Sequence, residues 1–256
     1  MSSPEEWFRA QPPITRTWLA VAFLTTVLVS TGYLSAYTLA FIPSKLLEGE
    51  VWRLVTPFIY VGEFGFPFVM NLFFLVRYSG AYEASPYAMT GPGVVQGCTA
   101  DYVLALLVNS LILLCIALYM GLYFMGSSLV FSVLYLWSKK NADVPVSFWG
   151  FAFKGAHLPF ALIAMSLLMG NSPMGDVIGV VAGHCFYFVA EVLPLKYGRQ
   201  FLQTPQWLIA AVDWVNGTHT VHVAPGGGGQ RIVPPARNQG GFAGYNWGQG
   251  RRLGDD

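Results

Sequence analysis

Charged residues are scarce in this sequence. Asp, Glu, Lys and Arg make up 11% of the 256 residues, whereas 54% are hydrophobic. A soluble domain carries roughly 25% charged residues, so this chain cannot cover itself with polar surface. Its mean hydropathy of +0.50 therefore predicts a membrane protein. The net charge of +1 gives no basic excess, and we expect no nucleic-acid partner.

Cysteine is also rare. The three cysteines, Cys98, Cys115 and Cys185, are odd in number and lie in or beside apolar segments. This pattern indicates small core residues rather than disulfide partners. They show no metal-ligand spacing, so we expect neither a metal site nor another cofactor.

The N-terminal stretch lacks the features of a cleavable signal peptide. Residues 1–16 are polar, carry both charge signs and precede any apolar run. Trp7 and Phe8 are residues typical of the lipid headgroup region. We therefore expect residues 1–16 to be a cytosolic or interfacial segment, and the first span to direct insertion.

Long apolar segments dominate the rest of the chain. An α-helix needs about 20 apolar residues to cross a bilayer. We predict six spans: Thr17–Leu39, Phe64–Gly80, two within Tyr102–Ser138 that meet near Met120–Gly126, Ala156–Met169, and Pro173–Pro194. The second is interrupted by polar residues and proline, and the fifth is short.

The segments between these spans are more polar. Phe41–Thr56 is amphipathic, which predicts a helix half sunk in the membrane surface. We expect a loop over Ala81–Ala100 and a polar, aromatic connector over Lys139–Lys154. The fold class is therefore an all-α membrane protein, a six-helix bundle with an interfacial first loop.

Basic residues predict the orientation. Six spans place both termini on one side, whereas five or seven would separate them. On the N-terminal side lie Arg9, Arg16, Arg77, Lys139, Lys140, Lys154, Lys196 and Arg199, against Lys45 and Arg53 opposite. This bias favours cytosolic termini.

The composition changes after the last span. We divide the chain into residues 1–16, a membrane domain over 17–195, an amphipathic juxtamembrane segment over 196–215, and a tail over 216–256. Gly, Pro, Asn, Gln and Arg dominate the tail, which predicts disorder. Its last twelve residues, Tyr245–Asp256, have the composition of a docking peptide.

The sixth predicted span carries a periodic set of small and polar residues. Asp176, Gly179, Gly183, Tyr187 and Glu191 follow steps of three and four and share one helix face. Gly179 and Gly183 form a G-x-x-x-G motif, which permits close helix packing. The acids and the neighbouring His184 favour a polar, water-accessible bundle interior.

Serine and histidine in membrane helices raise the possibility of an intramembrane serine protease. Such an enzyme needs a serine within hydrogen-bond reach of a histidine base. The candidates are Ser127, Ser128, Ser132 and His184. A membrane-helix serine more often bonds its own backbone, and His184 is more typical of a packed interior histidine.

Several segments together resemble the derlins, rhomboid-fold pseudoproteases of the endoplasmic reticulum. The similarity covers essentially the whole chain and rests on four features in the family's order. These are Trp52-Arg53, Gly179-x-x-x-Gly183, Phe201-Leu-Gln-Thr-Pro-Gln206 and Trp247-Gly-Gln-Gly-Arg-Arg-Leu-Gly254. The last looks like the SHP box with which derlins bind the valosin-containing-protein AAA ATPase, and it assigns Trp247, Gly248, Gly250, Arg251, Leu253 and Gly254 to that contact.

The resemblance also implies loss of catalysis. Active rhomboids carry G-x-S-G at the start of the fourth span, and here the nucleophile position falls on Phe131. Their catalytic histidine lies three residues before the first glycine of G-x-x-x-G, which here is Asp176. The resemblance therefore implies an inactive rhomboid-like fold with no catalytic residues.

The implied role lies in endoplasmic-reticulum-associated degradation, with both termini in the cytosol. Derlins help misfolded clients leave the lumen, with a membrane RING ubiquitin ligase and the ATPase. We expect lipid contacts, with a homo-oligomer possible. Local bilayer thinning and a polar groove would ease the passage of a client chain across the membrane. The residues we expect to contribute to this passage are Trp52, Arg53, Glu63, Asn71, Asp176, His184 and Glu191. An active intramembrane protease, a small-solute transporter and a derlin-like protein of a symbiont-derived plastid membrane are the alternatives.

Overall fold

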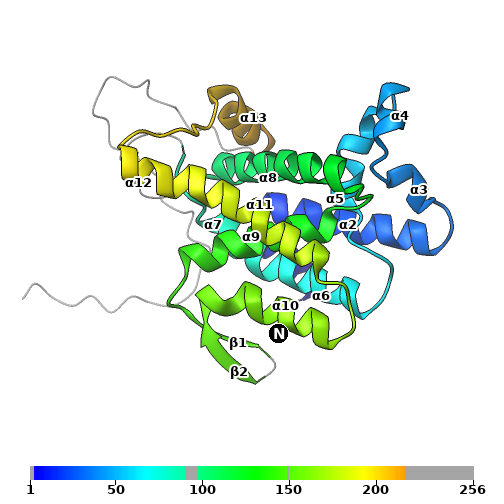
Figure 1. Ribbon diagram of the computed structural model, residues 1–256, viewed down its shortest axis with the longest axis horizontal. Coiled ribbons are helices and arrows are strands. Elements are labelled where there is room, and N and C mark those ends of the chain that lie inside the picture. Colours follow the sequence, from blue (N-terminus) through cyan, green and yellow to red (C-terminus); the bar gives the residue numbers. More distant parts are fainter. Residues whose placement is uncertain (1–2, 90–96, 149, 217–256) are drawn as a thin grey trace, which may run out of the picture. The chain divides into compact units, whose positions relative to one another are not determined.

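The computed structural model describes residues 3–89, 97–148 and 150–216, and almost all of its regular structure is helical (Figure 1). The α-helices are α1 (Pro4–Ala10), α2 (Pro13–Ser30), α3 (Ala36–Leu39), α4 (Pro43–Leu47), α5 (Thr56–Ile59), α6 (Phe66–Phe74), α7 (Gly80–Ala84), α8 (Thr99–Met120), α9 (Gly126–Lys140), α10 (Leu158–Leu168), α11 (Met174–Tyr187), α12 (Leu193–Tyr197) and α13 (Gln206–Asn216). Short 3₁₀ turns lie at Val51–Leu54 and Gly155–His157, and π-helical turns lie at Leu75–Ser79 and Phe188–Val192. Two strands, β1 (Pro145–Phe148) and β2 (Phe151–Lys154), form a hairpin.

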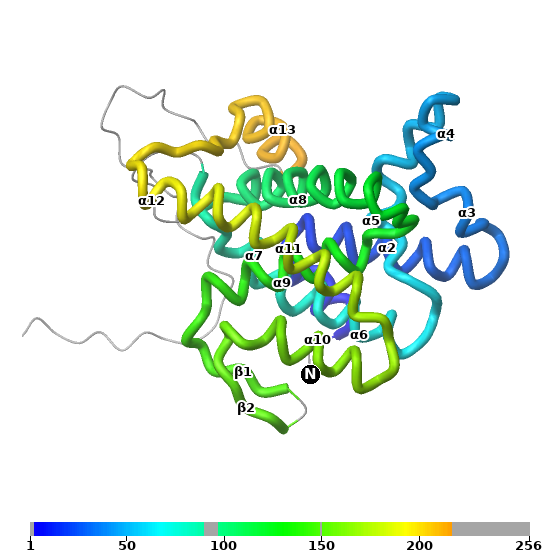
Figure 2. Tube along the Cα trace, viewed as in Figure 1, coloured from blue at the N-terminus to red at the C-terminus, as the bar shows by residue number. Residues whose placement is uncertain are grey.

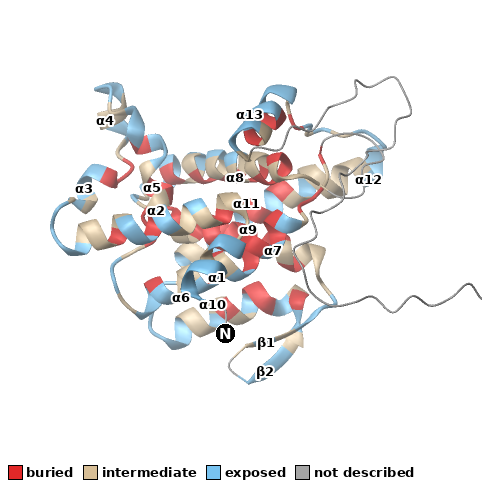
Figure 3. Cartoon of the chain, turned by 180° about the vertical axis from the view of Figure 1, so that it is seen from behind, coloured by how far each residue is buried: buried red, intermediate tan, exposed pale blue. Residues whose placement is uncertain are grey.

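Helix α9 is the centre of the bundle. It packs against α11, α8, α6 and α10, which surround it along the chain's tube trace (Figure 2). Nearly every residue of α9 up to Ser138 is buried, whereas the outer helices are buried along one face only (Figure 3). The core therefore lies on both sides of α9 and not at one end of the bundle.

Three helices within the described ranges are long and apolar enough to cross a membrane. They cover Pro13–Ser30, Thr99–Met120 and Met174–Tyr197, and Gly155–Leu168 is a shorter apolar helix. These helices confirm the all-α membrane fold. The number of spans stays a prediction, because α9 and α10 are each shorter than a full bilayer requires.

Several predicted boundaries are wrong. The first span ends at Ser30 instead of Leu39. The second continues through a π-helical turn to Ala84, and Pro194 does not end the last helix, which runs to Tyr197 and stops at the left-handed Gly198. The turn between the third and fourth spans is confirmed, because Gly121 adopts φ +70° directly after α8.

The amphipathic segment Phe41–Thr56 is not one helix. It consists of α4, the 3₁₀ turn Val51–Leu54 and the start of α5. Gly49 separates the first two pieces with φ +99°, a conformation that L side chains rarely adopt. The amphipathic periodicity was compatible with one helix, but Gly49 interrupts the helix.

The connector over Lys139–Lys154 contains the unforeseen hairpin. Its register pairs Pro145 with Lys154 and Phe148 with Phe151, and Gly150 at φ +85° closes the turn. Val146, Phe148 and Phe153 pack against the core between α6, α9 and α10. The hairpin is therefore held by this core, since an isolated two-stranded hairpin is marginally stable.

A buried carboxylate caps the first long helix. The Glu83 carboxylate accepts hydrogen bonds from the backbone nitrogens of Ile14 at 3.0 Å and Thr15 at 2.7 Å. The Thr15 hydroxyl bonds Glu83 and Ser79, and the Ser79 hydroxyl in turn lies 2.5 Å from that of Tyr102. This chain of bonds joins the start of α2 to α7 and α8, and it replaces a cap that no local side chain supplies.

The last described helix belongs to the bundle. Leu208, Ile209 and Val212 of α13 are buried against the first turns of α8. The Thr204 hydroxyl donates to the Asp101 carboxylate, and the Thr204 backbone nitrogen donates to the Met89 carbonyl at 3.1 Å. The juxtamembrane segment is thus fixed on α8.

Candidate functional site

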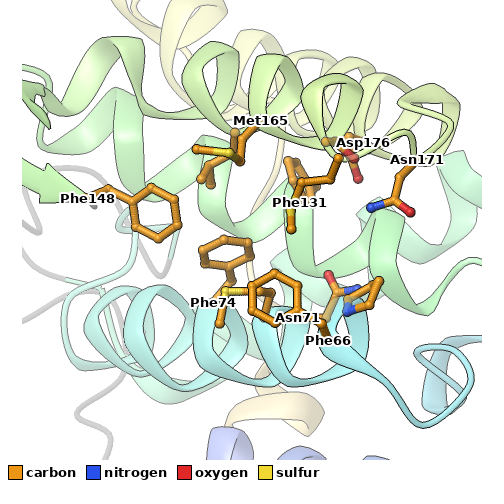
Figure 4. A pocket seen from close by; sticks show the side chains of 13 residues that line it. Phe66, Asn71, Phe74, Phe131, Phe148, Met165, Asn171 and Asp176 are labelled. Carbon is orange, nitrogen blue, oxygen red and sulfur yellow. The ribbon is translucent and has the colours of Figure 1, made fainter. Parts of the chain in front are cut away.

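A cavity of about 80 Å³ lies between α6 and α10, with α9 as its floor. Both helices pack on α9, and the cavity occupies the space that separates them (Figure 4). Its lining residues come from α6, α9, β1, α10, the turn after α10 and the start of α11: Phe66, Pro67, Met70, Asn71, Phe74, Phe131, Phe148, Leu162, Met165, Ser166, Met169, Asn171 and Asp176.

The polar residues of the cavity gather at one end. Asn171 and the Asp176 carboxylate lie together, while the Phe148 ring lies at the opposite end (Figure 4). Asn71 faces them from α6. A cavity of this volume with several polar partners has room for water, because a single water molecule needs about 10–15 Å³ of such space.

Phe131 and Asp176, which the family resemblance predicts at the two protease positions, both line this cavity. Phe131 is buried, and its ring meets that of Phe74 edge to face at a centroid distance of 6.2 Å. The phenyl ring of Phe131 has no nucleophilic atom, and the Asp176 side chain is a carboxylate. The structure therefore brings these two residues together in a cavity with aromatic and acidic walls.

The serine and histidine candidates do not meet within the described residues. The Ser132 hydroxyl is fully buried and donates to the Leu129 carbonyl at 2.8 Å. His184 Nδ1 lies 2.7 Å from the Tyr135 hydroxyl. Each group thus already has a different partner, the backbone for Ser132 and a phenol for His184.

His184 and Glu191 lie in another environment. His184 is exposed, and Glu191 lies in the π-helical turn after α11 near Lys140 and Tyr87. Burial raises the pKa of Tyr87, and the Glu191 carboxylate adds to this rise, so the phenol stays neutral. Neither His184 nor Glu191 lines the cavity, and neither does the exposed Glu63. The expected single groove is therefore divided: the structure brings together Asn71 and Asp176 alone.

Gly179 and Gly183 lie where α11 touches α9. A Cβ atom added to Gly179 would overlap the Ser128 carbonyl oxygen and would lie 2.7 Å from the Cβ of Phe131. A Cβ at Gly183 would lie 2.8 Å from the Ser132 carbonyl oxygen. Only glycine permits this approach, which brings the α11 backbone against α9 beneath the cavity.

Arg53 is buried in the first loop with 2% of its surface exposed. Its guanidinium donates to the Glu50 carboxylate at 2.6 Å and to the carbonyls of Tyr37 at 2.6 Å and Ala40 at 2.8 Å. The neighbouring Trp52 is 51% exposed. Arg53 therefore joins α3 to the following 3₁₀ turn, whereas Trp52 is available to the surroundings.

Sequence reasoning missed Phe148, Ser166 and Asn171 at the cavity. It included Thr204 within the stretch Phe201–Gln206 but did not predict its bond to Asp101. For Phe148 the only available signal was the alternating pattern of a strand, which extends over just four residues. The predicted tail contacts, Trp247 to Gly254, lie outside the described residues. Among the residues that the structure describes, no group of three or more His, Cys, Asp or Glu side chains is placed to hold a metal ion.

Comparisons with known proteins agree with one another. A model of the Der1-like family matches residues 11–206. Derlin-1 of Mus musculus is 35% identical over 267 aligned positions, which cover 100% of both chains. Derlin-1 of Arabidopsis thaliana is 33% identical over 233 positions, with 89% of this chain and 85% of the relative covered. Derlin-2.1 of Zea mays is 36% identical over 219 positions, with 80% and 85% covered.

Proposed function

Since the chain belongs to the Der1-like family, we propose that it is a non-enzymatic component of endoplasmic-reticulum-associated degradation. In this role it helps misfolded proteins pass from the lumen or membrane of the endoplasmic reticulum to the cytosol. It does so as a multi-pass membrane protein with both termini in the cytosol.

The cavity between α6 and α10 is the observation that supports this proposal most directly. Phe131 and Asp176 line it, the two residues that the family resemblance assigns to the dyad positions of a rhomboid protease. These residues supply no acyl-transfer chemistry. They do supply an apolar wall and a hydrogen-bonding end, which suit temporary contact with a polypeptide.

The length of α10 supports a locally thin apolar layer. Its 11 residues extend about 16 Å, roughly half of a 30 Å hydrocarbon core. A bilayer relieves such mismatch by thinning around the protein. A thin layer next to a cavity that can hold water lowers the cost of moving unpaired peptide groups, which otherwise reaches several kcal/mol each.

The proposed partners follow from the family resemblance and the tail sequence. The terminal run from Trp247 to Gly254 binds the valosin-containing-protein AAA ATPase, and the membrane domain assembles with a membrane RING ubiquitin ligase. The ATPase supplies the pulling force on the cytosolic side. Trp247→Ala or Leu253→Ala should weaken capture of the purified ATPase by residues 240–256, and undiminished capture by both variants would contradict the assignment.

Turnover of a luminal misfolded protein tests the proposed role of the membrane domain in client passage. In cells that rely on this chain, Asp176→Leu should slow client clearance, because it removes the carboxylate from the polar end of the cavity. Asp143→Leu is the matched control, since Asp143 is exposed beside the hairpin. Equal clearance by both variants would refute a role for the cavity.

A cleavage assay tests the proposal that the protein is not a protease. Purified chain reconstituted with a helix-destabilised membrane substrate should leave the substrate intact. Cleavage that disappears with Ser132→Ala would establish the protease instead. The buried bond from Ser132 to the Leu129 carbonyl makes this outcome contrary to the geometry.

A further inference from the structure

The outer face of α13 is apolar, although α13 is the last described helix. This face, here called the α13 outer face, consists of Trp207, Ala210, Ala211, Trp214 and Val215, all exposed. Trp207 is 67% exposed, Trp214 79% and Val215 68%. Steps of three and four place the two tryptophans on the same side, two turns apart. Large apolar side chains exposed together mark a binding surface.

The inner face of α13 fixes where this surface lies. Leu208, Ile209 and Val212 pack against Ala100 and its neighbours, at the beginning of α8. The bond from Thr204 to Asp101 holds the chain just before α13 to the same turn. Because α8 is a candidate span that begins at Thr99, α13 lies at the end of a spanning helix. The outer face is therefore continuous with the boundary between membrane and water.

The chemistry of the surrounding segment selects lipid as the occupant. Tryptophan and tyrosine concentrate at the headgroup level, because one part of each ring system is apolar and another is polar. Tyr197, the last residue of α12, is 57% exposed, and Phe201, between α12 and α13, is 54% exposed. Lys196 and Arg199 are exposed in the same stretch, and basic residues there attract anionic headgroups.

We propose that α13 lies in the headgroup layer of the cytosolic leaflet, with Trp207 and Trp214 inserted among anionic lipids. One face of the helix then contacts protein and the other contacts lipid. Asn216, the last described residue, is thereby held at the membrane surface, and the tail begins there. The choice of leaflet rests on the cytosolic termini of the proposed function, whereas the contact with lipid stands apart from the proposed passage of clients.

Spin labels on the full chain test the proposal. Cys98, Cys115 and Cys185 are replaced by serine, which also serves as a good N-cap at position 98. Single labels are then placed through Trp207→Cys, Trp214→Cys and, as the exposed control before the helix, Gln203→Cys. The protein is reconstituted at high dilution in vesicles with and without phosphatidylserine.

Collision with oxygen, which concentrates in lipid, is compared with collision with a water-soluble nickel chelate. We expect the ratio of oxygen to nickel collisions at positions 207 and 214 to be several-fold higher than at position 203. Lys196→Gln with Arg199→Gln should lower this ratio in phosphatidylserine vesicles only.

Two results would overturn the proposal. Labels at positions 207 and 214 that are as accessible to the nickel chelate as position 203 would place the outer face in water. A raised ratio that disappears when the protein is diluted further in lipid would assign the face to a second copy of the chain.

Discussion

The two sides of α9 are built in different ways. Towards α11 the contact is made by backbone, with Gly179 and Gly183 directly against the carbonyls of Ser128 and Ser132. Towards α6 and α10 the contact is made by large rings and long side chains, and a cavity of about 80 Å³ lies between them. Two helices in backbone contact cannot shift slightly without losing that contact, whereas side chains at an interface can adapt by changing rotamer. The difference indicates a rigid pair, α9 with α11, beside an adaptable opening between α6 and α10.

The strongest test of the rigid side is Gly179→Leu. Overpacking typically costs about 1–3 kcal/mol, and here the cost should exceed that range because the clashing atom is a backbone carbonyl. We expect a large drop in the thermal unfolding midpoint of the detergent-purified protein. Client clearance should fail as well.

Gly175→Ala is the control for that experiment. It lies one turn earlier on α11, but its added Cβ would meet the hydroxyls of Ser128 and Ser127 at ordinary contact distances of 3.5 and 3.6 Å. A similar midpoint for both variants would show that the α9–α11 contact is not as tight as the structure has it.

On the adaptable side, Phe74→Ala should enlarge the cavity. Removing a buried phenylalanine side chain usually costs about 3–5 kcal/mol. We expect a cost near 3 kcal/mol, at the lower end, because part of the ring already faces open space. Chemical unfolding measures the change. Phe73→Ala, the exposed neighbour on α6, should leave stability nearly unchanged, and an equal loss in both variants would count against a packed cavity wall.

Arg53 extends the comparison to the first loop, which is fixed by a buried charge. Arg53→Lys keeps the charge but cannot reproduce bonds to a carboxylate and two carbonyls. Hydrogen bonds to charged groups contribute about 1.5–3 kcal/mol each, so we expect a net loss of about 2 kcal/mol. Limited proteolysis of the loop gives the measurement. Lys45, which pairs with Glu48 in the same loop and is partly exposed, is the control: Lys45→Gln should have little effect, and greater damage from it would contradict the role of Arg53.

The smallest effect on stability, and the most specific on function, should come from Asn71→Leu. The side chain is partly exposed at the cavity, so the change in unfolding free energy should stay within about 1 kcal/mol. Client clearance should nevertheless slow, because the polar end loses an amide. Met70→Leu, an apolar exchange at the same cavity, should leave both unchanged. A loss of stability without a loss of clearance in Asn71→Leu would separate the cavity from the function.

Local signals in the sequence predicted much of this fold. The uncharged stretch around α8 and α9, with Gly121 at its turn, gave the two central helices, and the G-x-x-x-G motif lies at the tight contact. The resemblance predicted that Phe131 and Asp176 stand at the nucleophile and histidine positions of active rhomboids, and the two residues line one cavity.

What could not be predicted depends on three-dimensional contacts. Asp176 and Glu191 share a helix face in the sequence, but 15 helical residues separate them by about 22 Å along the axis. A shared face therefore does not make a shared site. The hairpin escaped prediction because its strands have four residues each and depend on the core behind them. The bond between Asp101 and Thr204 joins residues too distant in sequence for any periodicity to indicate it.

The cap of α2 has a consequence for biogenesis. The amides at the start of this helix are satisfied by Glu83, a residue synthesised 68 and 69 positions later. While the ribosome is still making the intervening chain, the first hydrophobic helix emerges with its leading end uncapped. The contact between α2 and Glu83 can form only after α7 has been synthesised. Insertion of α2 into the membrane and its docking against α7 are therefore separate events in time.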